Sequence, residues 1–113
     1  MSNFKTTKRD GLIISYRNEE EFERIYDDVF KQNEYSFKTS KKSPFILDCG
    51  SHIGVTVLYF KKLYPEARII AFDPNPRTFE LLKLNVDQNG LKNVELMNVA
   101  ISECRINECC HFR

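Results

Sequence analysis

The sequence has no tryptophan, only four glycines and four prolines, and no long uninterrupted apolar run. No stretch approaches the roughly 20 apolar residues that cross a bilayer, so a membrane-spanning helix is not expected. The first residues, MSNFKTTKRDG, also lack the apolar segment of a secretory signal peptide. Internal repeats and low-complexity segments are absent as well. These absences predict a globular domain that has no membrane partner.

Charge of one dominant sign is also missing. The 17 basic and 16 acidic residues give a formal net charge of +1 at pH 7. A binder of nucleic acid or of an anionic membrane surface would carry a clear basic excess, so neither partner is expected. What is present is a 42% hydrophobic share over 113 residues, which can support the core of one modest domain.

The four cysteines do not form a recognisable metal-binding pattern. Cys49 lies in the apolar run PFILDCG and is expected to pack as a small hydrophobic residue. Cys104, Cys109, Cys110 and His111 crowd the end of the chain without the paired C-x-x-C spacing of zinc sites. We therefore predict no metal site. Without a secretory signal, reduced thiols and a cytoplasmic location are expected.

Residues 1–43 predict a hairpin, a helix and a linker. Asp10-Gly11 favours a tight hairpin turn, followed by a second strand over 12–16. Asn18 is a candidate N-cap for a helix that begins with three glutamates, whose negative charge suits a helix N-terminus. Apolar residues then recur with helical spacing, and the polar stretch 38–43 closes the segment as a surface linker. The apolar positions are Phe22, Ile25, Tyr26, Val29 and Phe30.

Residues 44–102 alternate between strand and helix patterns. A strand that is buried on both faces is predicted over 45–49, a second buried strand over 67–72, and a third strand over 93–99. The first intervening helix ends before Pro65, and the second begins at Pro76 after the cap Asn75 and ends at Asn89-Gly90. The apolar residues Phe79, Leu82, Leu84 and Val86 are expected to line this second helix. The order β-α-β-α-β predicts an α/β, Rossmann-like parallel sheet with right-handed crossovers.

The residues with chemical potential follow two of these strands. Asp48, Gly50, Ser51, His52 and Gly54 form a glycine-containing turn between the first strand and its helix. Gly50 permits a tight turn and Gly54 a close approach to a strand or a ligand. The helix N-terminus offers free N–H groups that suit a carboxylate or phosphate.

The second feature is Asp73, which ends the next strand 23 residues after Gly50. An acid at about this distance hydrogen-bonds the ribose hydroxyls in nucleotide-binding α/β folds. Capping of the following helix is the alternative role for this carboxylate.

The turn favours S-adenosylmethionine over a dinucleotide such as NAD. Dinucleotide sites use G-x-G-x-x-G, in which the middle glycine admits the pyrophosphate. Ser51 and His52 occupy that region here, and Asp48 would repel a pyrophosphate but could face a sulfonium or ammonium group. An NAD-binding domain remains the less favoured alternative.

The segments FILDCGSHIGVTVLYF and IIAFDPNPRTFELLKLNVDQNGLKNVELMNVAIS resemble the FkbM family of S-adenosylmethionine-dependent methyltransferases, over residues 11–102. The resemblance implies that the turn 48–54 holds the methionine part of the cofactor and that Asp73 binds the ribose. It also implies O-methylation of a sugar or another small hydroxyl-bearing or glycan acceptor. His52 departs from the small or amide residue usual at its position, and no catalytic residue is identified.

The resemblance also implies a larger, seven-stranded sheet, of which this chain supplies the first three parallel strands. A K-I-D-V-E-G-like segment found later in relatives is absent. The tail 103–113 is too short for another parallel crossover but could add an antiparallel strand. We interpret the chain as the cofactor-binding portion, with a truncated gene product as one explanation. A non-catalytic remnant or interaction module is the alternative, and self-association through the exposed edge of strand 45–49 is expected.

Overall fold

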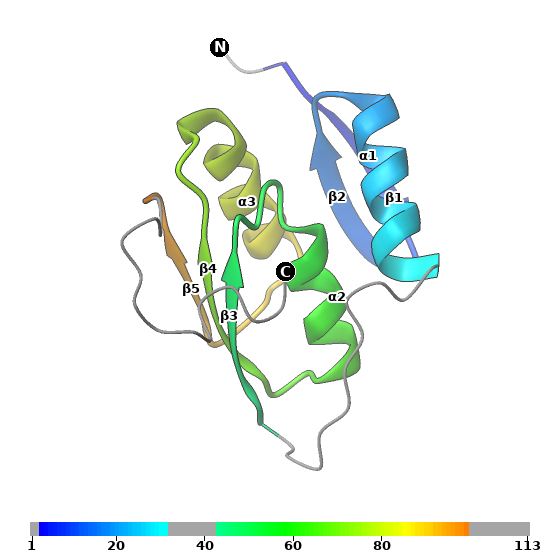
Figure 1. Ribbon diagram of the computed structural model, residues 1–113. Helices are drawn as coiled ribbons and strands as arrows, with labels where there is room; N and C mark the ends of the chain where they lie inside the picture. The colour runs from blue at the N-terminus through cyan, green and yellow to red at the C-terminus, as the bar shows by residue number, and fades with distance from the viewer. Residues whose placement is uncertain (1–2, 32–42, 100–113) are drawn as a thin grey trace.

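The computed structural model describes residues 3–31 and 43–99. The tail 103–113 and all but Ser43 of the predicted linker 38–43 lie outside these ranges. The described elements are β1 (Lys5–Arg9), β2 (Leu12–Tyr16), α1 (Glu19–Tyr26), the π-helical turn η1 (Asp27–Lys31), β3 (Phe45–Cys49), α2 (Val55–Leu63), β4 (Arg68–Phe72), α3 (Pro76–Gln88) and β5 (Val94–Met97) (Figure 1). None of the described helices is long and apolar enough to cross a membrane.

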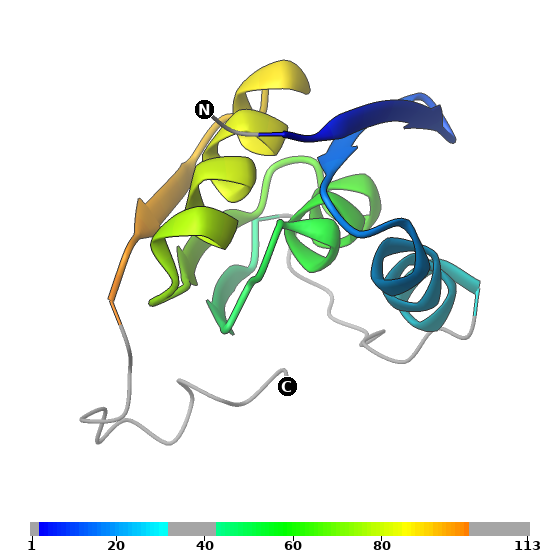
Figure 2. The ribbon, with the colours of Figure 1, turned by 90° about the horizontal axis from the view of Figure 1, so that it is seen from above.

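The strands β3, β4 and β5 form a parallel sheet in that order, which confirms the predicted α/β topology. Ile46 pairs with Ile69, which in turn pairs with Val94, so the strands begin in near alignment. Figure 2 shows α2 and α3 on the same side of this sheet, as expected when both crossovers are right-handed and lead in the same direction. The carboxyl ends of β3 and β4 therefore meet at one edge of the sheet.

The N-terminal elements form as their local signals predict. Asp10 and Gly11 both have positive φ values, 50° and 80°, which is the geometry of a type I′ hairpin turn. The Asn18 side chain accepts a hydrogen bond from Glu21 N at 2.8 Å and so caps α1. The helix ends earlier than its apolar spacing predicts, because the chain widens into the π-helical turn after Tyr26.

The β1–β2 hairpin packs against α3, and a buried amide joins them. Asn85 Oδ1 accepts from Ser15 N at 2.7 Å, while Asn85 Nδ2 donates to Ser15 O at 3.1 Å and to Ile53 O at 2.7 Å. This contact explains a difference from the predicted helix face. Leu81 and Asn85 are buried, whereas Phe79 and Leu84 are only half-buried.

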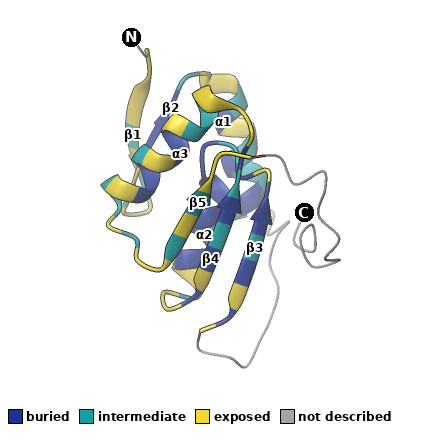
Figure 3. Ribbon diagram, turned by 90° about the vertical axis from the view of Figure 1, so that its left-hand side faces the viewer, coloured by how far each residue is buried: buried dark blue, intermediate teal, exposed yellow. Residues whose placement is uncertain are grey.

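The core lies between the helices and one face of the sheet. Its largest fully buried side chains include Phe22, Phe60, Ile46, Ile69 and Leu82. The other face of the sheet is more open in the described part of the chain (Figure 3). Phe45 is 53% exposed and Met97 is 43% exposed. The expectation that strand 45–49 is buried on both faces was therefore wrong for its first residue, because no described helix packs on that side.

Candidate functional site

The turn between β3 and α2 has the backbone geometry of a ligand-binding loop. Gly50, His52 and Gly54 have positive φ values of 72°, 56° and 100°. Glycine adopts such values without a steric penalty, whereas histidine does so only under constraint from its surroundings. A Cβ added at Gly50 would meet no atom within 4 Å, so the space beside this residue is open.

Gly54 has a packing role instead. A Cβ at this position would lie 2.9 Å from Leu82 Cδ1 on α3, closer than real Cβ atoms approach a neighbour. The sequence predicted that Gly54 allows a close approach to a strand or a ligand, whereas the structure places Leu82 of α3 there. The start of α2 is thereby held against α3 beneath the turn.

The carboxylate of Asp48 stabilises the turn from below. Asp48 is fully buried, its Oδ2 lies 2.9 Å from Ser51 Oγ, and it also accepts a hydrogen bond from Thr56 Oγ1. These bonds tie the end of β3 to the turn and to the first turn of α2. Asp48 therefore shapes the loop from within. Thr56 was not singled out from the sequence, because a threonine inside a helix carries no motif signal.

Asp73 lies beside this turn. Cys49 pairs with Phe72, and Ser51 N donates to Phe72 O at 2.8 Å, which brings the residue after Phe72 next to the glycine turn. The Asp73 carboxylate accepts a hydrogen bond from Thr78 Oγ1 at the start of α3. The helix itself is capped by Asn75, which accepts from Arg77 N at 2.9 Å. Asp73 thus supports the helix start, although the N-cap is another residue.

The main chain of Asp73 is also fixed. Asp73 N donates to Met97 O at 3.0 Å, and Asn98 Nδ2 donates to Asp73 O at 2.8 Å. Asn98, which follows β5, was missed from the sequence. The carboxyl ends of β3, β4 and β5 therefore converge around Asp73, at the edge where ligands bind in open α/β sheets.

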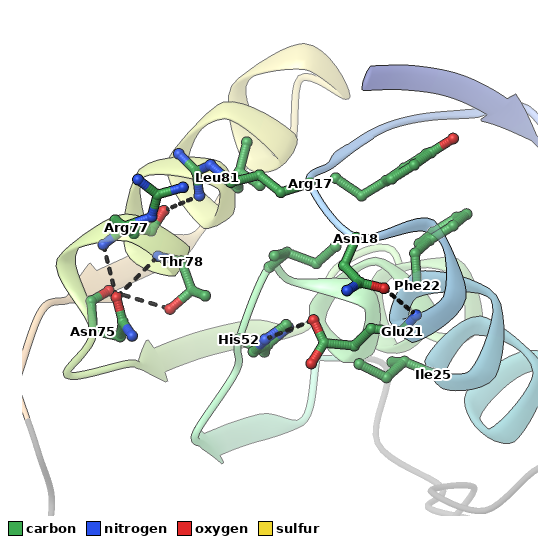
Figure 4. Close-up of a pocket in the computed structure, with 12 residues that line it drawn as sticks. Arg17, Asn18, Glu21, Phe22, Ile25, His52, Asn75, Arg77, Thr78 and Leu81 are labelled. Atoms are coloured by element: carbon green, nitrogen blue, oxygen red, sulfur yellow. Dashed lines mark hydrogen bonds and ion pairs between the residues drawn. The ribbon is translucent and has the colours of Figure 1, made fainter. Parts of the chain in front are cut away.

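His52 faces the N-terminal helix. Its Nε2 atom lies 3.6 Å from Glu21 Oε1, and its Nδ1 atom is buried without a hydrogen-bond partner among the described residues (Figure 4). Glu21 was interpreted from the sequence only as a favourable acid at a helix N-terminus. No periodicity relates residues 21 and 52, so their contact could not be predicted.

A pocket of about 200 Å³ lies beside His52, between α1 and α3. Three separate segments of the chain line it: the end of β2 with the start of α1, the glycine turn, and the start of α3. Its lining residues are Tyr16, Arg17, Asn18, Glu21, Phe22, Ile25, His52, Ile53, Asn75, Arg77, Thr78 and Leu81. The pocket thus contains His52 from the predicted site but not Asp48, Gly50 or Asp73.

Within residues 3–31 and 43–99, no group of three or more His, Cys, Asp or Glu side chains could hold a metal ion. Cys104, Cys109, Cys110 and His111 lie outside these ranges. Cys49 is buried, as predicted for a small packing residue.

The chain is similar in sequence to two curated methyltransferases. No family model matches the sequence. The chain is 35% identical over 79 residues to methyltransferase sdnD of Sordaria araneosa, and 33% identical over 75 residues to methyltransferase 1 of Beauveria bassiana (strain ARSEF 2860). These alignments cover 69% and 66% of this chain but 30% of each relative. The chain thus spans less than a third of the length of these curated relatives.

The fold has a counterpart of known structure. The crystal structure of M. jannaschii TYW2 in complex with AdoMet superposes with a TM-score of 0.68 at 16% identity, over 95% of this chain and 48% of that one. The fold is therefore an incomplete Rossmann-like α/β fold. The described residues contain three of its parallel strands and the two helices between them.

Proposed function

We propose that this chain is the cofactor-binding part of an S-adenosylmethionine-dependent methyltransferase. The observation that carries the proposal is the hydrogen bond from Ser51 N to Phe72 O, which sets the glycine turn beside Asp73 at adjoining strand ends. The 35% identity to a methyltransferase across 79 residues supports the same activity.

The residues at this edge fit the cofactor. The open space beside Gly50 leaves room for the methionine part over the turn. Asp73 supplies a carboxylate that can accept hydrogen bonds from ribose hydroxyls, and Thr78 keeps it in place. When bound, S-adenosylmethionine supplies a methyl group on a sulfonium, and the task of these residues is to bind and orient it.

The dinucleotide alternative has less support from the site. Ser51 is buried and bonded to Asp48, and His52 occupies the position that the middle glycine of a dinucleotide motif would keep clear. The buried Asp48 carboxylate beneath the turn also disfavours a pyrophosphate above it. NAD is therefore the negative control for binding experiments.

We further propose membership of the FkbM family and transfer of the methyl group to a hydroxyl oxygen of a sugar, glycan or other small acceptor. Both rest on the sequence resemblance over residues 11–102. A cytoplasmic location is proposed as well. A non-catalytic remnant that retains the fold is the competing hypothesis, and a methyl-transfer assay on a panel of hydroxylated acceptors separates the two.

Calorimetric titration of the full chain tests the cofactor assignment. S-adenosylmethionine and S-adenosylhomocysteine should bind, and NAD should not. Asp73→Asn keeps an acceptor for Thr78 but loses the charge, so it should weaken cofactor binding by about 1.5–3 kcal/mol. Asp87→Asn, an exposed site on α3, is the matched control and should bind as the parent does. Tight NAD binding without a response to S-adenosylmethionine would reverse the assignment.

A further inference from the structure

The pocket between α1 and α3, hereafter the α1–α3 pocket, is not explained by the proposed cofactor site. It lies beside that site, because His52 belongs to the glycine turn and Thr78 bonds the Asp73 carboxylate. At about 200 Å³ it is smaller than most ligand pockets, which span roughly 300–1,000 Å³. It can therefore hold a small molecule, or one ring of a larger one.

The floor of the pocket is apolar. Phe22, Ile53 and Leu81 are buried there, and the Tyr16 ring stacks on Phe22 with centroids 4.6 Å apart. Such a surface accepts the C–H face of a small ring. It also fixes the depth of the pocket, because these side chains belong to the core cluster.

Polar groups line the sides of the pocket. On the α1 side, the Glu21 carboxylate lies 3.6 Å from His52 Nε2, beyond hydrogen-bond distance, so both groups keep capacity for a ligand. The Nδ1 atom of His52 has no partner among the described residues. An acidic acceptor next to an imidazole suits hydroxyl groups, which donate to the first and exchange hydrogen bonds with the second.

The opposite side is cationic. Arg17 NH1 donates to Arg77 O at 2.6 Å (Figure 4). Arg17 NH2 pairs with Glu80 Oε1 at 2.8 Å, so the charge of Arg17 is compensated. The guanidinium of Arg77 has neither an ion pair nor a hydrogen bond within the described ranges. Guanidinium groups bind carboxylates in a bidentate geometry. The pocket thus combines hydroxyl-binding groups on one side with an uncompensated cation on the other.

We propose that the α1–α3 pocket is the subsite for the methyl acceptor, and that it takes a small hydroxylated molecule that carries a carboxylate. Arg77 binds the carboxylate, Glu21 and His52 bind hydroxyls, and Leu81 and Phe22 contact the apolar face. The assignment rests on the proposed function, because it needs a cofactor at the adjoining strand ends.

Binding of D-glucuronate to the full chain saturated with S-adenosylhomocysteine tests the proposal. Methyl resonances of Ile25 and Leu81 report on the pocket, and methyl α-D-glucopyranoside provides the same hydroxyls without the charge. We expect glucuronate to shift these resonances and to bind more tightly than the glucoside. Arg77→Gln should weaken glucuronate binding by about tenfold to hundredfold, since a charge-assisted contact is lost.

Arg24→Gln, an exposed position on α1, is the matched control and should leave glucuronate binding unchanged. Both variants should retain the parental affinity for S-adenosylhomocysteine, which separates the acceptor pocket from the cofactor site. Equal affinity for glucuronate and glucoside, an unshifted pocket, or competition between glucuronate and S-adenosylhomocysteine would each overturn the proposal. If S-adenosylhomocysteine fails to bind, the proposed function is wrong. Titration of the cofactor-free chain with glucuronate still measures binding to the α1–α3 pocket.

Discussion

Two glycines of the same turn are needed for different reasons. Gly50 has a positive φ and open space beside it, whereas Gly54 has a positive φ and lies against Leu82, whose Cδ1 would be 2.9 Å from an added Cβ. The first constraint is a backbone preference. The second adds a steric requirement imposed by another helix.

Substitution with alanine should separate these constraints. Gly50→Ala should lower the free energy of unfolding by about 1–2 kcal/mol, the cost of a side chain in the left-handed region. Gly54→Ala should lower it by about 1–3 kcal/mol more, because α3 must also shift. Urea unfolding of both variants measures the difference. Equal losses would show that the contact with Leu82 relaxes freely.

The sequence predicted the helix caps correctly but not the side-chain contacts between distant segments. Asn18 and Asn75 were predicted as N-caps, and both side chains accept hydrogen bonds from the first turns of their helices. A cap acts within three residues, so the sequence contains all of its information. Thr78 beside Asp73 and Glu21 beside His52 could not be predicted in this way, because those contacts depend on how helices are placed.

Among the elements, the hairpin and α1 are joined through one buried phenol. Tyr26 donates a hydrogen bond to Asp10 in the hairpin turn, and nearby Arg9 pairs with Glu23. Burial, and then the bond to Asp10, hold the pKa of Tyr26 well above its usual value near 10. The folded chain therefore retains this proton at a pH at which the unfolded chain releases it.

This difference predicts a loss of stability at alkaline pH. Above about pH 10 the unfolded state binds fewer protons than the folded state, so the free energy of unfolding falls as pH rises, by at most about 1.4 kcal/mol per pH unit for one group. Tyr26→Phe should remove this contribution. Urea unfolding at about pH 9 and about pH 11 should show a smaller loss in the variant than in the parent.

Lys61 does not disturb the comparison. Burial lowers the pKa of Lys61, so this group raises the free energy of unfolding as pH rises toward its usual pKa of 10.5. This contribution is the same in the parent and in Tyr26→Phe. Parallel alkaline losses in the parent and in Tyr26→Phe would show that the phenol ionises equally in both states.

The elements themselves were largely predictable. β3 has the predicted bounds, and the parallel order of the three strands follows from the alternating β-α-β-α-β pattern. The third strand is shorter than the predicted 93–99, and the face of α3 was only partly right. An apolar pattern could not show that a polar residue, Asn85, is buried where the hairpin meets that helix.

For the whole molecule, β3 pairs only with β4 within the described residues, and one face of the sheet exposes Phe45 and Met97. An unpaired edge along an apolar strand is a template for association. We therefore retain the prediction that the chain associates with itself through this edge.

Light scattering over a range of concentrations checks this prediction. The parent should increase in mass with concentration, and Phe45→Lys should reduce that increase, because an edge lysine opposes strand pairing. Phe4→Lys is the control, because Phe4 is another exposed aromatic residue but lies near the N-terminus. This variant should associate as the parent does. A concentration-independent monomer would contradict the prediction.

The amide of Asn85 bonds main-chain atoms of Ser15 and Ile53, and its Oδ1 atom also accepts a hydrogen bond from Gln88 Nε2 on the same helix at 3.2 Å. The identities of residues 15 and 53 can therefore vary without breaking these bonds, provided that their backbones stay in place. Residue 85 has no such freedom, since it must supply a donor and an acceptor at once. Position 85 thus joins three distant segments and tolerates few substitutions. Replacing Asn85 would disturb the hairpin and the glycine turn together.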